Sequence, residues 1–378
     1  MLMMNLQFLR PLYAHPGPWA SVYLDVTTNV PNANVAIGLR WRRAMEQLVA
    51  AGAHPATIAA LEDAVLGHDP APSGPAGLAL FATDGMVVLD EVLGAPPRRD
   101  IAHWGPLPHV LPMLAQRGEQ IGWLQIVADR TGADLSGVSA GGVARSLAVT
   151  GSEEFPIRKV KPGGWATPRY QRAAEETWHR NAGDVAAAAA ELADRLGAEV
   201  LVVGGDEHAV PELIDQLPAR WRERAVRTDA GSRGAGADPA ALDDATIRAI
   251  ADVAERRARA ALDRFGVQHG RGAPADTGLA AAIAALQRGA ADGLLLVDDP
   301  SATGRLWVGP EPTQLGAEPA DLHAMGVATP RRDRADAALV RALTCTDAEL
   351  MLVAAGAAPL TGGVGTLLRY ADVGSGRG

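Results

Sequence analysis

Short runs of consecutive apolar residues, separated by helical segments, constrain the fold of this chain most strongly. Three such runs lie at residues 200–203, 294–297 and 350–353. A strand that is covered on both faces is apolar throughout, whereas a half-exposed strand alternates between apolar and polar residues. Because these runs are separated by helical segments, we predict an α/β chain in which helices cover both faces of a sheet.

The length of 378 residues predicts two or three domains, because a single core seldom grows beyond about 250–300 residues. Apolar residues make up 48% of the chain and charged residues 21%, so a packed core is expected and wholesale disorder is not. We place an N-terminal α/β domain at residues 1–118, a middle domain at 119–272 and a C-terminal α/β/α domain at 273–378. A loop without periodicity, residues 151–168, interrupts the middle domain.

Local patterns predict the main elements of each domain. Residues 78–89 are expected to form a hairpin, because two β-rich runs flank the turn Asp84-Gly85. In the middle domain, a helix is expected at 170–196, directly after the loop. In the last domain, the polar stretch 309–332 is rich in proline and glycine and predicts a long loop.

The charge of the chain limits how it could bind nucleic acid. The formal net charge is −9, which argues against a protein that coats nucleic acid non-specifically. Residues 155–180 differ from the rest, because they carry six basic, two acidic and four aromatic residues. Basic side chains neutralise phosphates and aromatic rings stack on bases, so this segment could grip RNA locally. The alternative to RNA binding is that this segment is the solvent-exposed beginning of a helix and that its arginines have no binding role.

The other candidate phosphate, metal and thiol sites are better explained by structural roles. No glycine motif for phosphate or dinucleotide binding is present, and no histidine pair has zinc-site spacing. Asp129, Asp134 and Asp206 could meet on a nuclease-like sheet and hold magnesium, but each also stands where a turn or helix cap favours aspartate. Cys345 is expected to be a small buried residue. We therefore predict no metal and no cofactor.

The chain is expected to be cytoplasmic. Its first ten residues lack the basic segment of a signal peptide, and no run approaches the roughly 20 apolar residues that a membrane span requires. We predict no contact with a membrane.

Three segments carry a resemblance to a known superfamily. They are residues 202–206, residues 277–297 and the glycine-rich stretch 362–370. Together with the domain order they resemble archaeal and eukaryotic release factor 1 and its relative Pelota. The likeness is greatest to the bacterial branch, which includes the Balon-type ribosome hibernation factors of actinobacteria. It covers nearly the whole chain and implies an RNase H-like middle domain.

The loop of the middle domain departs from the release-factor pattern. In release factors this loop carries Gly-Gly-Gln, which helps water attack the ester of peptidyl-tRNA. Here Gly163 and Gly164 are retained, but Trp165 stands at the glutamine position. Indole offers one donor and no acceptor, so it cannot orient water as a carboxamide does. The stop-codon motif Asn-Ile-Lys-Ser is also absent from the first domain. Both departures predict a protein that is not a termination factor, and the replaced glutamine predicts that it is not an enzyme.

The resemblance implies a ribosome hibernation factor that occupies the A site, with its loop near the peptidyl-transferase centre. Its implied partners are ribosomal RNA, P-site tRNA, and elongation factor Tu or another translational GTPase. The alternative is a peptidyl-tRNA or aminoacyl-tRNA hydrolase in ribosome rescue, acting through Thr167, Arg169 or Gln171. A third is a scaffold that does not bind the ribosome. The predicted RNA-binding residues are Arg158, Lys159, Lys161, Gly163, Gly164, Trp165, Arg169, Tyr170 and Arg172.

Overall fold

The computed structural model describes most of the chain. The described residues are 2–28, 32–67, 75–117, 121–150, 167–233, 239–270, 277–299 and 304–370. Only the backbone is described for residues 2, 3, 167–178, 269 and 270.

Contacts divide the chain into two compact units. Unit 1 comprises Met1–Glu119 and Ala258–Gly378, and unit 2 comprises Gln120–Arg257. The first division falls beside the predicted boundary at 118. The second differs from the predicted boundary at 272, because helix α8 (Pro239–Gly270) contributes its first part to unit 2 and its last part to unit 1. The first and third predicted domains share one unit, and the division into three domains stays a prediction.

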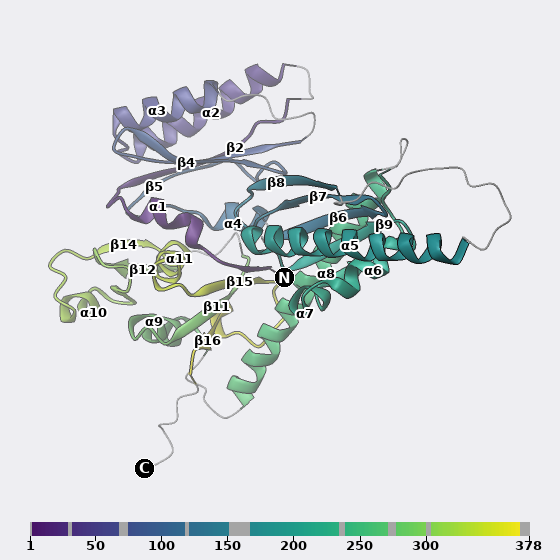
Figure 1. Cartoon of the computed structure of the whole chain (residues 1–378). Coiled ribbons are helices and arrows are strands. Elements are labelled where there is room, and N and C mark those ends of the chain that lie inside the picture. The colour runs from purple at the N-terminus through teal and green to yellow at the C-terminus, as the bar shows by residue number, and fades with distance from the viewer. Residues whose placement is uncertain are drawn as a thin grey trace, which may run out of the picture. The chain divides into compact units, whose positions relative to one another are not determined.

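The N-terminal part of unit 1 is an antiparallel sheet covered by two helices. The strand order is β4-β3-β2-β5, with bounds Met86–Leu93, Gly77–Thr83, Trp19–Asp25 and Ile101–Gly105. Helices α2 (Ala33–Ala50) and α3 (Pro55–Leu66) pack on one face through an apolar cluster that includes Trp41, Leu48 and Leu61 (Figure 1). The predicted hairpin is confirmed: Asp84 and Gly85 have φ of 49° and 79° between β3 and β4.

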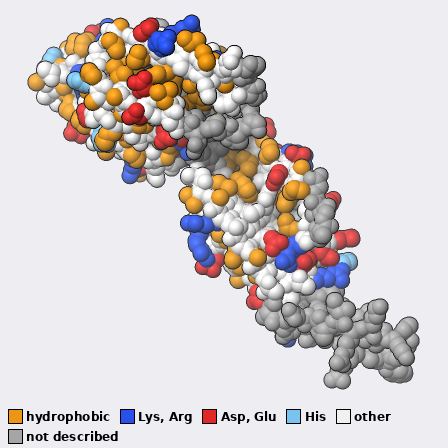
Figure 2. All heavy atoms as spheres, turned by 90° about the horizontal axis from the view of Figure 1, so that it is seen from above, with side chains coloured by type: hydrophobic (Ala, Val, Ile, Leu, Met, Phe, Trp, Pro, Cys, Tyr) orange, Lys and Arg blue, Asp and Glu red, His pale blue; other side chains and the backbone are white. Residues whose placement is uncertain are grey.

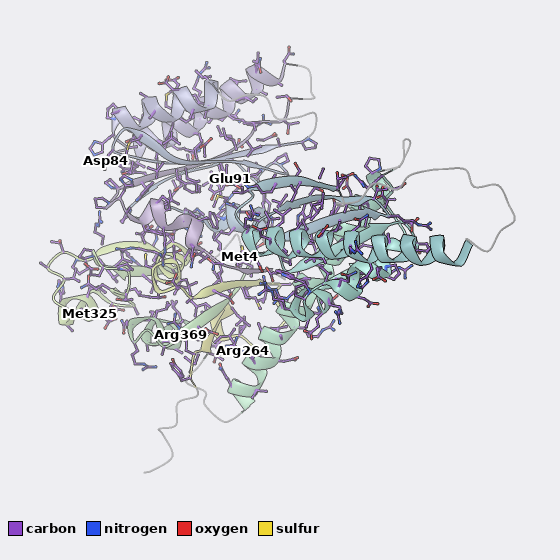
Figure 3. The ribbon with its side chains drawn as sticks, in the orientation of Figure 1. Met4, Asp84, Glu91, Arg264, Met325 and Arg369 are labelled. Atoms are coloured by element: carbon purple, nitrogen blue, oxygen red, sulfur yellow. The ribbon has the colours of Figure 1, made fainter. Side chains whose placement is uncertain are left out.

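The C-terminal part of unit 1 contains a four-stranded sheet of order β1-β15-β11-β16. Their bounds are Leu2–Met4, Glu349–Val353, Ala291–Val297 and Val364–Leu368. The two apolar strands β11 and β15 are parallel, as continuous apolar runs suggest. Strand β1 adds to the edge of β15 in antiparallel register, and Met4 lies there in Figure 3. The sequence analysis did not predict that the first strand joins the last sheet.

Helices cover both faces of this sheet. Helices α9 (Leu279–Gln287) and α11 (Ala335–Thr346) belong to the apolar cluster that includes Leu294, Leu350 and Leu352. The last part of α8 packs Phe265 against Leu295 and Met351 on the opposite side. Arg264 of α8 also pairs with Asp292 of β11 at 2.5 Å (Figure 3).

Two expectations for the C-terminal part were wrong, and the first concerns a second, three-stranded sheet. Its order is β13-β12-β14, with bounds Leu315–Gly316, Arg305–Val308 and Arg331–Arg334. The predicted long loop at 309–332 was wrong, because it contains β13 and the short helix α10 (Pro319–Ala324). A capping box between Glu318 and Asp321 closes the start of α10. Cys345 was expected to be buried, but it is exposed on α11.

Short helices complete the core between the two parts of unit 1. They are η1 (Gln7–Leu9), α1 (Arg10–Tyr13) and α4 (Leu111–Arg117). Tyr23 of β2 donates its hydroxyl hydrogen to the carbonyl of His109 at 2.7 Å, just before α4. The amide of Leu107 donates to Asp333 of β14 at 2.7 Å. Hydrogen bonds therefore cross a core that both ends of the chain build.

Unit 2 is a five-stranded mixed sheet of order β10-β9-β6-β7-β8. The bounds in that order are Ala225–Arg227, Val200–Gly205, Trp123–Asp129, Gly132–Val138 and Ala144–Thr150. The three strands β6, β7 and β8 are antiparallel neighbours, and β9 and β10 add parallel to β6. This arrangement is the RNase H-like sheet that the resemblance implied.

Helices cover both faces of the unit 2 sheet. Helices α5 (Thr167–Leu196), α6 (Ala209–Gln216) and α7 (Ala219–Arg222) contribute to a cluster that includes Val185, Leu213 and Trp221 on one face. The first part of α8 packs Leu242 and Val253 on the other. Within the described residues of the chain, no helix is both long and apolar enough to cross a membrane.

Candidate functional site

All nine predicted RNA-binding residues belong to the segment of sequence that follows β8 and continues into α5. Six of them fall within residues 151–166, which are outside the described residues: Arg158, Lys159, Lys161, Gly163, Gly164 and Trp165. Arg169, Tyr170 and Arg172 lie in the first turns of α5, where only the backbone is described. Their role in binding RNA stays a prediction. The structure does describe the elements from which this segment leaves and to which it returns.

The loop leaves from the carboxyl edge of the unit 2 sheet. Thr150, the last residue of β8, is paired with Gly132, and Gly132 is paired with Asp129 at the end of β6. Because β8 and β6 are both antiparallel to β7, their carboxyl ends meet at the same edge, and parallel β9 ends there too (Figure 1). In open α/β sheets this edge is where ligands usually bind.

Arginines neutralise the carboxylates along this edge. Arg233 donates from Nη1 to Asp129 at 3.0 Å and from Nε to Asp134 at 3.1 Å. Arg130 lies 3.4 Å from Asp206. Burial alone would raise the pKa of Asp129, but hydrogen bonds from Thr131 and the charge of Arg233 outweigh it and lower that pKa. Each of these three carboxylates therefore lies beside an arginine, and Asp129 and Asp134 share one.

Two of these aspartates, Asp129 and Asp206, act as turn and cap residues. Asp129 accepts hydrogen bonds from the amides of Thr131 at 2.7 Å and Gly132 at 3.0 Å in the turn between β6 and β7. Asp206 accepts from the amides of His208 and Ala209 at the start of α6. Among the described residues, no group of three or more histidine, cysteine, aspartate or glutamate side chains could hold a metal ion. Their contacts therefore support the structural interpretation of Asp129 and Asp206. For Asp134 the expected turn or cap position was wrong, because this residue lies within β7 and pairs with Arg233.

A cavity of about 530 Å³ opens beside this edge, between the end of β6, the middle of α5 and the start of α6. Buried aliphatic side chains line part of it, among them Val185 and Leu213. His179 of α5 lies at its rim, with Nδ1 2.5 Å from Oε1 of Glu212. This hydrogen bond lowers the pKa of Glu212.

The sequence analysis did not single out this cavity. Gln216, one turn after Glu212, donates to the backbone carbonyl of His179 at 2.7 Å and to the Glu212 carboxylate at 3.1 Å. The spacing of Glu212 and Gln216 is typical of neighbours on one helix face. It could have indicated a polar pair on α6, but not its contact with a helix 33 residues earlier in the chain.

Charge is otherwise mixed over the described surface. On the face seen in Figure 2, acidic and basic side chains of the described residues are interspersed, and no broad basic patch is visible there. This face therefore offers no extended basic surface for non-specific binding of a nucleic-acid backbone.

Comparison with known proteins identifies the family. The family model described as bacterial archaeo-eukaryotic release factor family 2 matches residues 123–271, from the first residue of β6 to just beyond α8. Two uncharacterized Mycobacterium tuberculosis proteins, MT2704 of strain CDC 1551 / Oshkosh and Rv2629 of strain H37Rv, are each 30% identical to this chain over 370 residues. Each alignment covers 97% of both chains.

The chain belongs to bacterial archaeo-eukaryotic release factor family 2. This confirms the predicted membership in the bacterial branch of the superfamily. The matched residues include the carboxyl edge of the unit 2 sheet and the residues that line the cavity. They also include Thr150 and Thr167, on either side of the loop.

Solved structures of archaeal proteins align over almost the whole chain at low identity. The archaeal termination factor aRF1 is 15% identical, with 96% of each chain covered and a TM-score of 0.26. Archaeoglobus fulgidus Pelota is 14% identical, covering 99% of this chain and 95% of its own, with a TM-score of 0.34. An archaeal Pelota from a ribosome-bound model with ABCE1 is 13% identical, covering 97% and 94%, with a TM-score of 0.41.

Proposed function

We propose that this member of family 2 is a cytoplasmic ribosome-binding factor that occupies the A site of idle ribosomes without releasing the nascent peptide. It acts as a hibernation factor, with the loop 151–168 directed towards the peptidyl-transferase centre. Family membership supports the class of partner. The chemistry of the loop supports the absence of release, because Trp165 replaces the group that would position water.

The observation that carries the proposal is where the loop is anchored. It leaves the sheet at Thr150, on the carboxyl edge, and the chain returns in the 30-residue helix α5. The 16 residues between Thr150 and Thr167 can extend and return over about 25 Å at about 3.3 Å per residue. A segment of that reach can enter a narrow RNA cavity while the rest of an acidic protein stays outside it.

The composition of the segment fits such a role. It contains both lysines of the chain, Lys159 and Lys161, whose compact ammonium groups neutralise phosphates as point charges. Gly163 and Gly164 allow close approach of the backbone to RNA. The indole of Trp165 offers a flat face on which a base can stack. The proposed ligands are ribosomal RNA and the end of P-site tRNA.

Co-sedimentation with purified ribosomes in sucrose gradients tests the binding. We expect the wild-type protein to sediment with ribosomes and Lys159→Glu/Lys161→Glu to stay at the top of the gradient. The control is Arg248→Glu/Arg256→Glu, which makes the same change of charge at exposed positions of α8. Co-sedimentation of the lysine variant equal to that of the control would overturn the role of the loop.

Release of labelled peptide from stalled ribosomes tests the absence of catalysis. We expect no release by the wild-type protein, because Trp165 stands where release factors carry glutamine. Release by the wild-type protein that is lost in Gly163→Val would instead establish the hydrolase, with Thr167, Arg169 or Gln171 as the residues to test next.

The proposal includes a translational GTPase as a partner, with elongation factor Tu as the first candidate. Adding purified elongation factor Tu with GTP to the sedimentation assay should increase the bound fraction if the GTPase delivers the protein. An unchanged fraction would mean that the protein reaches the ribosome alone.

A further inference from the structure

The described side chains of α5 that are buried lie in the later part of the helix. They begin at Asn181 and end at Leu196, whereas His179 and Arg180 are exposed. The backbone of α5 begins 12 residues before His179, at Thr167, and at 1.5 Å per residue this part is about 18 Å long (Figure 1). The contacts near the middle of α5 therefore determine where its first residue lies.

The contact between α5 and the rest of unit 2 is made largely by small side chains. Four of the seven α5 residues in the buried apolar cluster are alanine: Ala186, Ala189, Ala190 and Ala193. Methyl groups pack closely but interlock little with the surface beneath them, so they specify the direction of a helix weakly. A unique direction for α5 therefore requires directional contacts, such as hydrogen bonds.

Two side chains of α6 make such contacts with α5, ahead of the alanines. Oε1 of Glu212 lies 2.5 Å from Nδ1 of His179, and Gln216 donates from Nε2 to the backbone carbonyl of His179 at 2.7 Å. The pKa of Glu212 is lowered, so its carboxylate is ionised at neutral pH and can only accept. The hydrogen of the first contact is therefore on Nδ1, whatever the charge of the imidazole. Gln216 also donates to Glu212 at 3.1 Å, so the two α6 side chains hold each other in place.

A glycine one turn after His179 makes room for this group, which we call the α6 clamp. A Cβ at Gly183 would lie 2.8 Å from Oε1 of Gln216, closer than real Cβ contacts. Glycine inside a helix is less favourable than alanine, because it loses more backbone freedom on folding. The close approach of Gln216 gives a reason for glycine at this position.

Asn181 fastens α5 at a further point. Its Nδ2 donates to the backbone carbonyl of Arg130, in the turn after β6, at 3.3 Å. Its Oδ1 is buried and has no hydrogen-bond partner among the described residues, so Asn181 contributes one bond. Residues 179–183 of α5 therefore contact both α6 and the end of the sheet.

The α6 clamp should add little to the stability of unit 2. The side chains of His179 and Glu212 are 68% and 40% exposed, and contacts between exposed polar groups contribute little to the free energy of unfolding. A group of three polar side chains that stabilises the fold so little is better explained by the direction that it gives to α5.

We propose that Glu212 and Gln216 are positioning residues, which hold α5 in the direction that presents the loop 151–168 to the ribosome. Only this purpose rests on the proposed function, because the clamp itself is a property of unit 2. A tilt of about 10° at His179 would move Thr167 by about 3 Å, and a displacement of about 1 Å already impairs a site that needs a defined geometry. Removing the clamp weakens ribosome binding without unfolding the protein.

A distance measurement between two spin labels on the full-length protein tests the direction of α5. The labels are attached at Ala174→Cys on α5 and at Arg227→Cys, an exposed position of β10, after Cys345→Ser removes the single native thiol. We expect one narrow distance distribution, and a distribution at least about twice as broad after Glu212→Ala/Gln216→Ala. An equally narrow and unshifted distribution in that clamp variant would overturn the proposal.

Glu191→Ala is the matched control for the distance measurement. It removes a carboxylate from α5 whose pair with Arg195 on the same helix is exposed, with side chains 69% and 65% accessible. This change leaves the contacts between α5 and α6 in place, so the distribution should stay narrow. Equal broadening in the control and in the clamp variant would contradict a role of the α6 clamp.

Co-sedimentation with ribosomes tests the purpose of the clamp. Glu212→Ala/Gln216→Ala should lower the affinity for ribosomes at least about tenfold, and Glu191→Ala should leave it unchanged. Glu212→Gln keeps an acceptor for Nδ1 of His179 and should retain most of the binding. The urea midpoints of these variants should be similar, whereas a merely structural role would lower the midpoint together with the affinity. Full affinity of the clamp variant despite a broadened distance distribution would also overturn the proposal.

The two measurements separate the failure of this inference from the failure of the proposed function. If the wild-type protein does not co-sediment with ribosomes, the proposed function is wrong. The distance distribution then decides the clamp alone: broadening in Glu212→Ala/Gln216→Ala supports it as the device that directs α5, and an unchanged distribution overturns it.

Discussion

His109 Nε2 lies 3.5 Å from Oδ2 of Asp336, and both side chains are 9% exposed. This contact joins the segment after β5 to the first turn of α11. Arg334 donates to the same carboxylate, from Nη2 to Oδ2 at 2.6 Å. Burial lowers the pKa of His109 more than its bond to Asp336 raises it. Burial would raise the pKa of Asp336, but hydrogen bonds from His109 and Arg334 outweigh it and hold that pKa far below its usual value.

The stability of unit 1 should fall as the pH is lowered from 7 to 5. In the unfolded chain His109 takes up a proton near pH 6.5, about its ordinary pKa, whereas the folded protein keeps it neutral to lower pH. The unfolded state then binds more protons and is favoured. Urea unfolding at the two pH values measures the effect, and His109→Gln should flatten the profile. An equal loss in both proteins would exclude His109 as the cause.

Removing the carboxylate of Asp336 should destabilise the protein strongly. Asp336→Ala removes the carboxylate that buried His109 and half-buried Arg334 share, and breaking a buried pair in this way costs about 3–5 kcal/mol. The control is Asp292→Ala, whose pair with Arg264 is 2.5 Å long but has side chains that are 41% and 48% exposed. That change should cost less than about 1 kcal/mol. Similar unfolding midpoints for the two variants would contradict the assigned difference.

Arg233 should be required to neutralise the carboxyl edge of unit 2. In Arg233→Ala, Asp129 and Asp134 lose their common partner, so the free energy of unfolding should fall by about 1–2 kcal/mol. Millimolar magnesium should restore part of this loss, because two uncompensated carboxylates attract a divalent cation. Thermal unfolding with and without magnesium measures both effects. Arg145→Ala, at an exposed position of β8 in the same sheet, should show neither.

Gly205 should not tolerate a side chain. Its φ is +130°, and a Cβ there would overlap the carbonyl oxygen of Ala128 on the neighbouring strand. The backbone conformation alone costs a non-glycine residue about 1–3 kcal/mol, and moving β6 would cost more. Gly205→Ala should therefore lower the melting temperature or prevent folding. Gly266→Ala, in open space on α8, should instead stabilise by about 0.5–1 kcal/mol. The opposite order of melting temperatures would disprove this.

The parts of the fold that could be predicted from sequence are those that depend on local pattern. Strands β9, β11 and β15 are apolar because both of their faces are covered, and the hairpin follows from a two-residue turn. The stretch 309–332 was misread because β13 has two residues and α10 six, too few to show a period. Cys345 has buried neighbours on one side, but helical geometry turns it to the surface.

The candidate site was predictable only in part, for a related reason. The charged loop is a local feature of composition. The cavity depends instead on Asn181 of α5, Glu212 of α6 and Arg130 in the turn after β6, which come together only after folding. No spacing within one segment indicates that an amide oxygen will be left without a donor.

The pairing of β1 with β15 has a consequence for how a cell makes this protein. A ribosome synthesises Leu2–Met4 first and Glu349–Val353 among the last segments, yet these strands share hydrogen bonds in one sheet. All strands of unit 2 lie between β1 and β15 in the sequence. The unit 2 sheet can therefore form while the rest of the chain is still being synthesised. Unit 1 cannot complete its sheet until translation has passed β15. A product of interrupted synthesis would thus expose the unpaired edge of an unfinished sheet.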